Sequence, residues 1–292
     1  MGIGLTKRAI AGLLLAGLAS VPATRAMAQS ALEKAKSAGF IRAAIHNEPP
    51  YAYMTLEGKA AGLGPEIVTA VLARLGITQI DWVVTPFNSL IPGLKASRWD
   101  IVAAQQTIFP ARCEQVAFAE PTNTALEGLL VKTGNPKNLH SYDDLKKASG
   151  VMIATPSGTT ELNYLHAYGV PDSRLITIAN HADGAELVRS GRADAYTLEQ
   201  PSGNLLLSSG KAEGLELATP FAIPVVDGKK VISYGATTFR KDDTAFLEAY
   251  DKELKAFEQT PEFWAIEKKN GFTEESAKLA LAMTAAERCA AK

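Results

Sequence analysis

The sequence predicts a two-lobed α/β protein in which each lobe is a mainly parallel sheet flanked by helices. Two observations support this prediction. Short apolar runs alternate with helical patterns of roughly 8–15 residues, which is typical of βαβ units. Residues 94–104 and 187–197 also share the order helix end, Arg-x-Asp and strand start, as expected for two substructures built alike. Arg-x-Asp is, however, also a common way to leave a helix.

The expected elements follow one another along the chain. The predicted strands are residues 40–45, 80–84, 100–105, 151–155, 175–179 and 194–198. The predicted helices are residues 65–75, 90–97 after the cap residues Asn88 and Ser89, a helix that opens at 141, 160–169 and 184–191. Residues 246–272 have apolar positions at helical spacing, with Pro261 punctuating them.

The N-terminus has the three parts of a secretory signal. Lys7 and Arg8 precede the apolar run 9–19, and Ala26-Met27-Ala28 is a cleavage pattern. The run is shorter than the ~20 residues that span a membrane, although an uncleaved anchor is the alternative. We expect residues 1–28 to be a cleaved signal peptide and the protein to be periplasmic.

The composition of the remaining chain restricts its partners. The signal peptide removes three of the 30 basic residues and none of the 31 acidic ones, so the mature net charge is −4 with histidine neutral. There is no basic stripe interleaved with aromatic residues, which argues against nucleic-acid binding. The expected partners are therefore a small ligand or another protein.

The chain has two cysteines, Cys113 and Cys289. An isolated pair in an oxidising compartment favours a disulfide over a catalytic thiol. Such a bond would hold the C-terminal residues next to Arg112.

The usual signatures of enzymes and metal sites are absent. None of the four histidines (His46, His140, His166 and His181) lies in a metal-binding spacing, so no metal is expected. The sequence has neither a G-x-S-x-G elbow nor a nucleotide-binding glycine motif, and no cofactor is expected.

Polar and aromatic residues follow the ends of five predicted strands. Ligands of open α/β sheets bind at this edge. The candidate ligand-binding residues are Glu48, Tyr51, Phe87, Gln105, Thr107, Arg112, Thr159, Thr160 and Glu199.

These residue types suit a ligand that carries both charges. Arg112 offers a bidentate clamp for a carboxylate, and the helix start at 157–160 offers N–H groups and hydroxyls to an anion, or is a plain N-cap. Tyr51 and Phe87 suit a delocalised cation, or belong to the core of a lobe. Glu48 or Glu199 would pair with the cationic end, unless either is simply solvated. The pattern therefore predicts a site for a zwitterion.

A family resemblance rests on several motifs in a specific order. These are NEPPY (47–51), GLGPE (62–66), WDIVAA (99–104) with PAR (110–112), SGTTE (157–161), GRAD (191–194) and FRKDD (239–243). With them, the mature chain resembles the family 3 extracellular solute-binding proteins, the periplasmic receptors of polar amino acid ABC transporters. The resemblance implies a type II periplasmic-binding-protein fold, with lobe I from 30–125 plus 234–292, lobe II from 126–233 and the ligand cleft between them. It also implies a monomer that hands its ligand to ABC permease subunits.

Within that family the chain is most similar to ectoine- and hydroxyectoine-binding proteins. The resemblance carries the binding role to Glu48, Tyr51, Phe87, Arg112 and Thr160. Two positions depart from the pattern of ectoine receptors. Thr107 stands where a third aromatic residue is expected, and Glu199 is an acid where ectoine receptors lack one and amino acid receptors carry Asp. The expected ligand is therefore ectoine, hydroxyectoine or a polar amino acid.

Two other functions compete with a transport receptor. Some exported proteins of this fold are cyclohexadienyl dehydratases, whose reaction needs an acid such as Glu199 or Glu48 in the cleft. A periplasmic sensor domain is the other, and it is disfavoured because the chain ends at Lys292 with no membrane segment. We expect a binding protein and not an enzyme.

Overall fold

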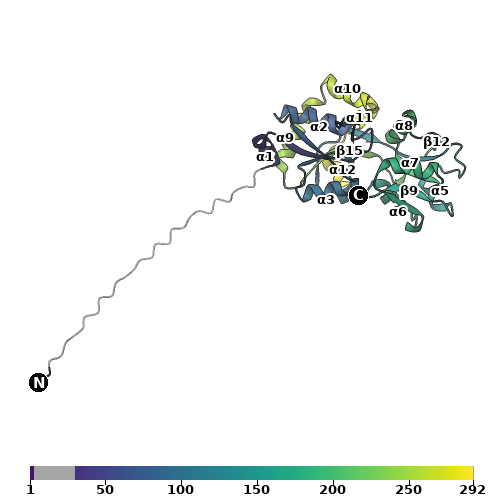
Figure 1. Cartoon of the computed structure of the whole chain (residues 1–292), viewed down its shortest axis with the longest axis horizontal. Coiled ribbons are helices and arrows are strands. Elements are labelled where there is room, and N and C mark those ends of the chain that lie inside the picture. The colour runs from purple at the N-terminus through teal and green to yellow at the C-terminus, as the bar shows by residue number, and fades with distance from the viewer. Residues whose placement is uncertain (3–29, 292) are drawn as a thin grey trace.

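The computed structural model describes residues 1–2 and 30–291, which form two lobes with a sheet in each (Figure 1). The first sheet has the strand order β4-β1-β5-β15-β6, with β7 also paired to β15. The second has the order β10-β9-β11-β8-β12. The two-lobed α/β prediction is therefore confirmed. Apart from its first two residues, the predicted signal peptide lies outside the described residues.

The strands are short. All six predicted strands are present with ends shifted by at most two residues, and the other strands are not predicted. The first sheet contains β1 (Ile41–Ile45), β4 (Ile80–Val84), β5 (Ile101–Thr107), β6 (Ala117–Phe118), β7 (Asn123–Ala125) and β15 (Ser233–Phe239). The second contains β8 (Glu127–Lys132), β9 (Ile153–Pro156), β10 (Leu175–Ile178), β11 (Ala195–Glu199) and β12 (Leu215–Leu217). Two further pairs are β2 (Tyr53–Met54) with β3 (Ala60–Ala61) and β13 (Val225–Val226) with β14 (Lys229–Lys230).

Helices flank both sheets. Those of the first lobe are α1 (Ala31–Ala38), α2 (Leu63–Arg74), α3 (Leu90–Lys95), α4 (Pro110–Cys113), α9 (Thr244–Phe257), α10 (Pro261–Lys269), α11 (Glu274–Leu281) and α12 (Ala285–Ala290), with the 3₁₀ turn η1 (Phe87–Ser89). Those of the second are α5 (Tyr142–Lys147), α6 (Thr160–Ala167), α7 (His181–Arg189) and α8 (Gln200–Ser208), with η2 (Asp172–Arg174). Among residues 1–2 and 30–291, no helix has the length and apolar character needed to cross a membrane.

Both sheets are mixed, whereas the sequence predicts mainly parallel ones. β1 runs parallel to β4 and β5, and β9 runs parallel to β10 and β11. β8 and β15 pair antiparallel with their neighbours. These are the strands by which the chain enters the second sheet and returns to the first, so each runs against the βαβ strands around it. The predicted limits of the two lobes stay predictions.

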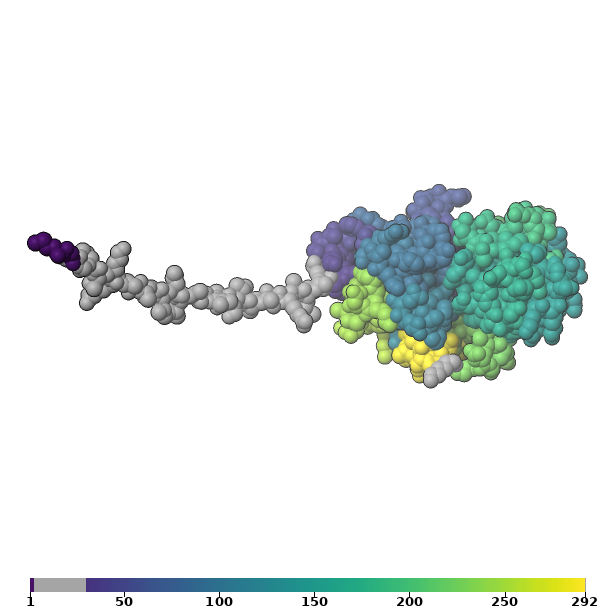
Figure 2. All heavy atoms as spheres, turned by 90° about the horizontal axis from the view of Figure 1, so that it is seen from below, coloured from purple at the N-terminus to yellow at the C-terminus, as the bar shows by residue number. Residues whose placement is uncertain are grey.

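The first lobe is held together by helix α2 packed between the sheet and the C-terminal helices. Ile67, Val71 and their neighbours on one face of α2 are fully buried, in the i, i+4 pattern that the sequence shows. They belong to one cluster with Phe246 and Phe257 of α9. Each such side chain contributes ~1.5–3 kcal/mol on burial. Residues from both ends of the described range 30–291 therefore form one core, and Figure 2 shows the C-terminal residues in yellow beside the N-terminal half in blue.

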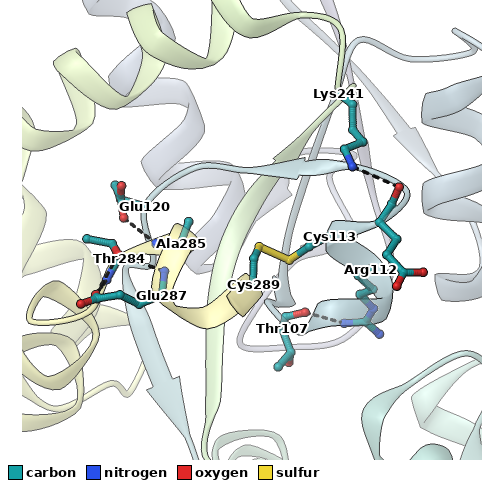
Figure 3. Close-up of a disulfide and its surroundings, with 10 residues drawn as sticks. Thr107, Arg112, Cys113, Glu120, Lys241, Thr284, Ala285, Glu287 and Cys289 are labelled. Carbon is teal, nitrogen blue, oxygen red and sulfur yellow. Dashed lines mark hydrogen bonds between the residues drawn. A yellow bond between two sulfur atoms is a disulfide. The ribbon is translucent and has the colours of Figure 1, made fainter. Parts of the chain in front are cut away.

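A disulfide joins α4 to α12, as the cysteine count predicts (Figure 3). Cys113 and Cys289 are 176 positions apart, with Cα atoms 5.7 Å from each other. Close by, the backbone N–H of Ala285 donates to Glu120 at 2.8 Å. The single-turn helix that carries Arg112 is thus anchored to the C-terminal helix.

Removing this disulfide is expected to lower the free energy of unfolding. For a loop of this length the chain-entropy model gives at most about 5 kcal/mol. The measurement is urea denaturation of the Cys113→Ser/Cys289→Ser variant beside the oxidised protein. An unchanged midpoint would show that the bond does not constrain the unfolded chain.

Candidate functional site

The predicted binding residues converge on one cavity between the lobes. All nine of them line it, together with Ala104 and Glu161. The first lobe supplies the loop after β1, η1, the end of β5 and α4, and the second supplies the start of α6 and the end of β11. The carboxyl ends of β1, β5, β9 and β11 therefore meet here, as the sequence analysis expects of open α/β sheets.

The loop after β1 is held by the N-terminus of α2. The backbone N–H of Leu63 donates to the carbonyl of Pro50 at 2.9 Å, and that of Gly64 donates to the carbonyl of Tyr51 at 2.8 Å. A Cβ on Gly64 would lie 2.4 Å from the carbonyl oxygen of Ala103, so the helix can approach this closely only with glycine there. The proline-rich turn therefore has a fixed place at the wall of the cavity.

The two aromatic candidates have different surroundings. Tyr51 is buried and its ring packs on Phe272 at 5.4 Å, so it belongs to the core and lines the cavity at the same time. The Phe87 ring already faces a cation, because the Arg112 guanidinium lies 5.0 Å from its centre. Phe87 thus positions Arg112 as well as shaping the site.

Arg112 spans the cleft from α4. Nη1 donates to the carbonyl of Thr107 at 3.0 Å (Figure 3). Nη2 donates to the carbonyl of Gly158 in the second lobe, also at 3.0 Å. Burial lowers the pKa of Arg112 to about 10, which still leaves it charged at neutral pH. A guanidinium has five N–H donors, so it retains donors for an anionic ligand.

Gln105 is held in an uncommon backbone conformation near the end of β5, with φ of +48°. Its Oε1 accepts a hydrogen bond from Thr122 at 3.2 Å, while its buried Nε2 has no hydrogen-bond partner among the described residues. An amide donor that lines the cavity in this way suits an acceptor on a ligand.

The start of α6 has a threonine at the N-cap position, but the side chain of this residue does not cap the helix. Thr159 is the N-cap residue, yet its hydroxyl donates to the carbonyl of Pro156 at 3.0 Å and makes no cap hydrogen bond. The Thr160 hydroxyl faces Glu161 Oε2 at 3.4 Å. Both threonines are buried against the cavity.

Two buried carboxyls face the cavity from the second lobe. Glu161 and Glu199 are 4% and 9% exposed, so Glu199 is not a solvated side chain. Burial, followed by the charges of Glu161 and Glu48, raises the pKa of Glu199 to about 8. Burial, followed by the charge of Glu48, also raises the pKa of Glu161. A cation placed between these carboxyls would offset both the cost of burying their charged forms and the repulsion between them.

Glu48 is occupied by protein groups rather than free for a ligand. Its Oε1 accepts a hydrogen bond from Ser202 at 3.0 Å, and its Oε2 lies 2.6 Å from His46 Nε2 and 3.0 Å from His181 Nε2. Burial alone would raise the pKa of Glu48, but His181 and His46 outweigh it and hold that pKa well below its usual range.

Sequence reasoning missed several residues of this region. Glu161 looks like an acid that complements the dipole in the first turn of a helix, so nothing marked it for binding. His46 directly follows β1 and His181 is the first residue of α7, more than 130 positions later. Ser202 lies in α8, a helix that the sequence analysis did not predict.

The lobes are closed on each other. Ser202 with Glu48, His181 with Glu48, and Arg112 with the Gly158 carbonyl each join one lobe to the other. Asn88 Nδ2 adds a longer contact to the Ser157 hydroxyl, at 3.4 Å. A two-lobed α/β fold with a closed polar cleft at its strand ends is the architecture of a solute-binding receptor.

Comparison with known proteins establishes the family. Residues 41–273 match the model of the bacterial extracellular solute-binding proteins, family 3, and the chain belongs to that family. A protein named "probable amino-acid ABC transporter periplasmic-binding protein" from Sinorhizobium fredii is 41% identical over 271 residues, covering 89% of each chain.

Solved structures agree with this assignment. The crystal structure of EhuB in complex with hydroxyectoine has a TM-score of 0.82 and 34% identity, and covers 89% of this chain and 98% of that one. An ancestral amino acid-binding protein, AncCDT-1, described as a precursor of cyclohexadienyl dehydratase, has a TM-score of 0.72 at 24% identity, covering 82% of this chain and 99% of that one. The second likeness concerns the fold alone.

Gly158 offers a test of closure. Its φ is +80°, and an added Cβ would lie 3.0 Å from Asn88 Cβ in the opposite lobe. Gly158→Ala is expected to weaken solute binding about tenfold. The added methyl group would press against Asn88 only when the lobes are closed, and a tenfold loss corresponds to destabilising the closed form by ~1.4 kcal/mol. Isothermal titration calorimetry measures this effect.

Gly150→Ala is the matched control. Gly150 has a φ of +72° in the same lobe, but no atom lies within 4 Å of an added Cβ. The Gly150→Ala variant should lose ~1 kcal/mol of free energy of unfolding through backbone strain, about as much as Gly158→Ala, and should bind solute normally. Equal affinities for the two variants would contradict the closed arrangement.

Proposed function

We propose that this protein is the periplasmic receptor of an ABC importer for a small zwitterionic solute. The observation that carries the proposal is the pairing of Arg112 with Glu161 and Glu199 across a single closed cavity. Arg112 holds the anionic end of the solute, with Gln105 Nε2 as a further donor. The two glutamates receive the cationic end.

This charge pattern favours a polar amino acid over ectoine or hydroxyectoine. A compact ammonium group can donate to two carboxylates at once, since it has three N–H donors. The delocalised cation of ectoine is better served by aromatic faces, and Thr107 supplies none where the resemblance expects one. The relative from Sinorhizobium fredii supports the amino acid, and the likeness to EhuB keeps both ectoines in the test set.

The permease of an importer recognises the closed form of its receptor. A solute that contacts Arg112 in one lobe and Glu199 in the other stabilises the closed form over the open one. The closed receptor, acting as a monomer, then delivers the solute to the permease subunits.

Arg112→Ala is expected to abolish measurable solute binding, with a loss of at least 100-fold, or ~2.7 kcal/mol. Removing one partner of a buried charged contact costs at least this much. Arg112→Lys is the control, because it keeps the charge and loses the fork of donors; it should recover only part of the affinity. Titration calorimetry against polar amino acids, ectoine and hydroxyectoine is the measurement, and unchanged affinity in Arg112→Ala would refute the proposal.

Solute binding at pH 7 is expected to release about one proton. Glu199, with a pKa of about 8, is mostly protonated in the empty site, and a bound cation would bring that pKa well below 7. The binding enthalpy should therefore differ between phosphate and Tris buffers in proportion to their ionisation enthalpies. Glu199→Gln should remove this difference, and identical enthalpies for the parent protein would rule out a protonated Glu199.

The dehydratase alternative has one specific observation in its favour: Glu199 is an acid that keeps its proton at neutral pH. The relatives reported above are named as solute-binding proteins, so we expect no turnover. Incubation with prephenate should give no phenylpyruvate. Its formation, lost in Glu199→Gln, would reverse the proposal.

A further inference from the structure

A cluster of two histidines and a glutamate joins the lobes beside the solute cavity. His46 and Glu48 lie in the loop after β1, in the first lobe, and His181 begins α7, in the second. They are 3%, 7% and 7% exposed. One ligand atom of each lies within 4.8 Å of the other two, the one such group of three found among the described residues. We refer to these residues as the cross-lobe cluster.

We propose that the cross-lobe cluster binds a divalent transition-metal ion, with Zn²⁺ as the best match. Two imidazole nitrogens and one carboxylate oxygen are the ligand set of three-coordinate protein zinc sites that keep a fourth position open. Mg²⁺ and Ca²⁺ prefer all-oxygen sites and do not fit two imidazoles. The fourth position would be taken by water.

Neighbouring residues hold two of the three ligands, His181 and Glu48, whereas His46 Nδ1 has no hydrogen-bond partner among the described residues. Tyr196 Oη shares a 2.5 Å hydrogen bond with His181 Nδ1, and His181 Nε2 lies 3.0 Å from Glu48 Oε2 without a hydrogen-bond partner of its own among those residues. Ser202 fixes Glu48 through Oε1 and leaves Oε2 for the cluster. Second partners of this kind are typical of metal-binding histidines and carboxylates, because they set the tautomer and the ring orientation.

The electrostatic surroundings favour a cation at this place. Glu48, Glu161 and Glu199 are all buried in the same region, and Arg112 is the one buried arginine that lines the cavity. Buried charges of one sign are costly without compensation, and a divalent ion at Glu48 supplies two positive charges beside this cavity.

A shared proton is the competing occupant. The present separations, 2.6 Å from Glu48 Oε2 to His46 Nε2 and 3.0 Å to His181 Nε2, are hydrogen-bond distances. Ligands at ~2.0–2.2 Å in tetrahedral geometry lie about 3.3 Å apart. The ion would therefore replace the protons and move Glu48 Oε2 about 0.7 Å farther from His46 Nε2 and about 0.3 Å farther from His181 Nε2. Metal binding should therefore release protons and weaken in acid.

The location of the cluster gives the metal a consequence for transport. A metal ion ligated by both lobes binds the closed form better than the open one. By linkage, it must then raise the affinity for any solute that also selects the closed form.

The test titrates Zn²⁺ into chelator-stripped protein at pH 7.5, without solute. We expect one ion per chain, at least a tenfold loss of affinity in His46→Gln and in His181→Gln, and no comparable binding of Mg²⁺. His166→Gln is the matched control, because His166 pairs with Asp172 at 2.9 Å on the surface and lies outside the cluster. The visible spectrum of bound Co²⁺ reports the geometry independently of affinity.

Two results would overturn the proposal. One is the absence of stoichiometric Zn²⁺ binding, which would leave the cluster with protons only. The other is binding that persists in the His46→Gln/His181→Gln variant, with native thermal unfolding, or that disappears in His166→Gln, which would place the ion on the surface. Solute titration of stripped protein is a separate measurement, so failure of the metal site and failure of the proposed receptor function give different results.

Discussion

The closed contact between the two lobes buries three carboxyl groups, and the free-energy cost of burying them constrains the whole cleft. Glu48, Glu161 and Glu199 are removed from water in one region that contains a single arginine of the cavity, Arg112. Burial of these carboxyls, followed by the repulsion between them, opposes closure and raises the pKa of Glu199 and Glu161. A cationic group between the lobes removes that opposition. The empty closed cleft is therefore the costly state, and occupation by the right charge makes it stable.

The three carboxyls solve this problem in different ways. Glu48 is satisfied within the protein by Ser202, His46 and His181, so it acts as a contact between the lobes. Among the described residues no basic side chain forms an ion pair with Glu161 or Glu199, and burial raises the pKa of both. In the proposed function the cationic end of the solute therefore belongs to Glu161 and Glu199. The ligand-binding role of Glu48, which also lines the cavity, stays a prediction.

Much of the fold and most of the cavity could be predicted from the sequence, because both depend on local patterns. The ends of β1, β5, β9 and β11 are marked by apolar runs that stop at polar residues, and these ends converge in any sheet of this class. The antiparallel strands β8 and β15 could not be found in the same way. The direction of each depends on the distant strands beside it, β11 for β8 and β5 for β15, which lie outside any local window of the sequence. The partnership of His46 with His181 is likewise a product of tertiary structure, since neither histidine has a ligand neighbour at metal-binding spacing.

The disulfide is directly connected to the wall of the cavity through α4. Cys113 follows Arg112 directly, so the bond to Cys289 anchors the helix that carries the cleft-spanning guanidinium. The Thr107 carbonyl and the rings of Phe87 and Phe109 restrain that guanidinium further. Arg112 is therefore held from the first lobe. From the second lobe, the Gly158 carbonyl accepts its hydrogen bond, and Glu161 and Glu199 line the same cavity.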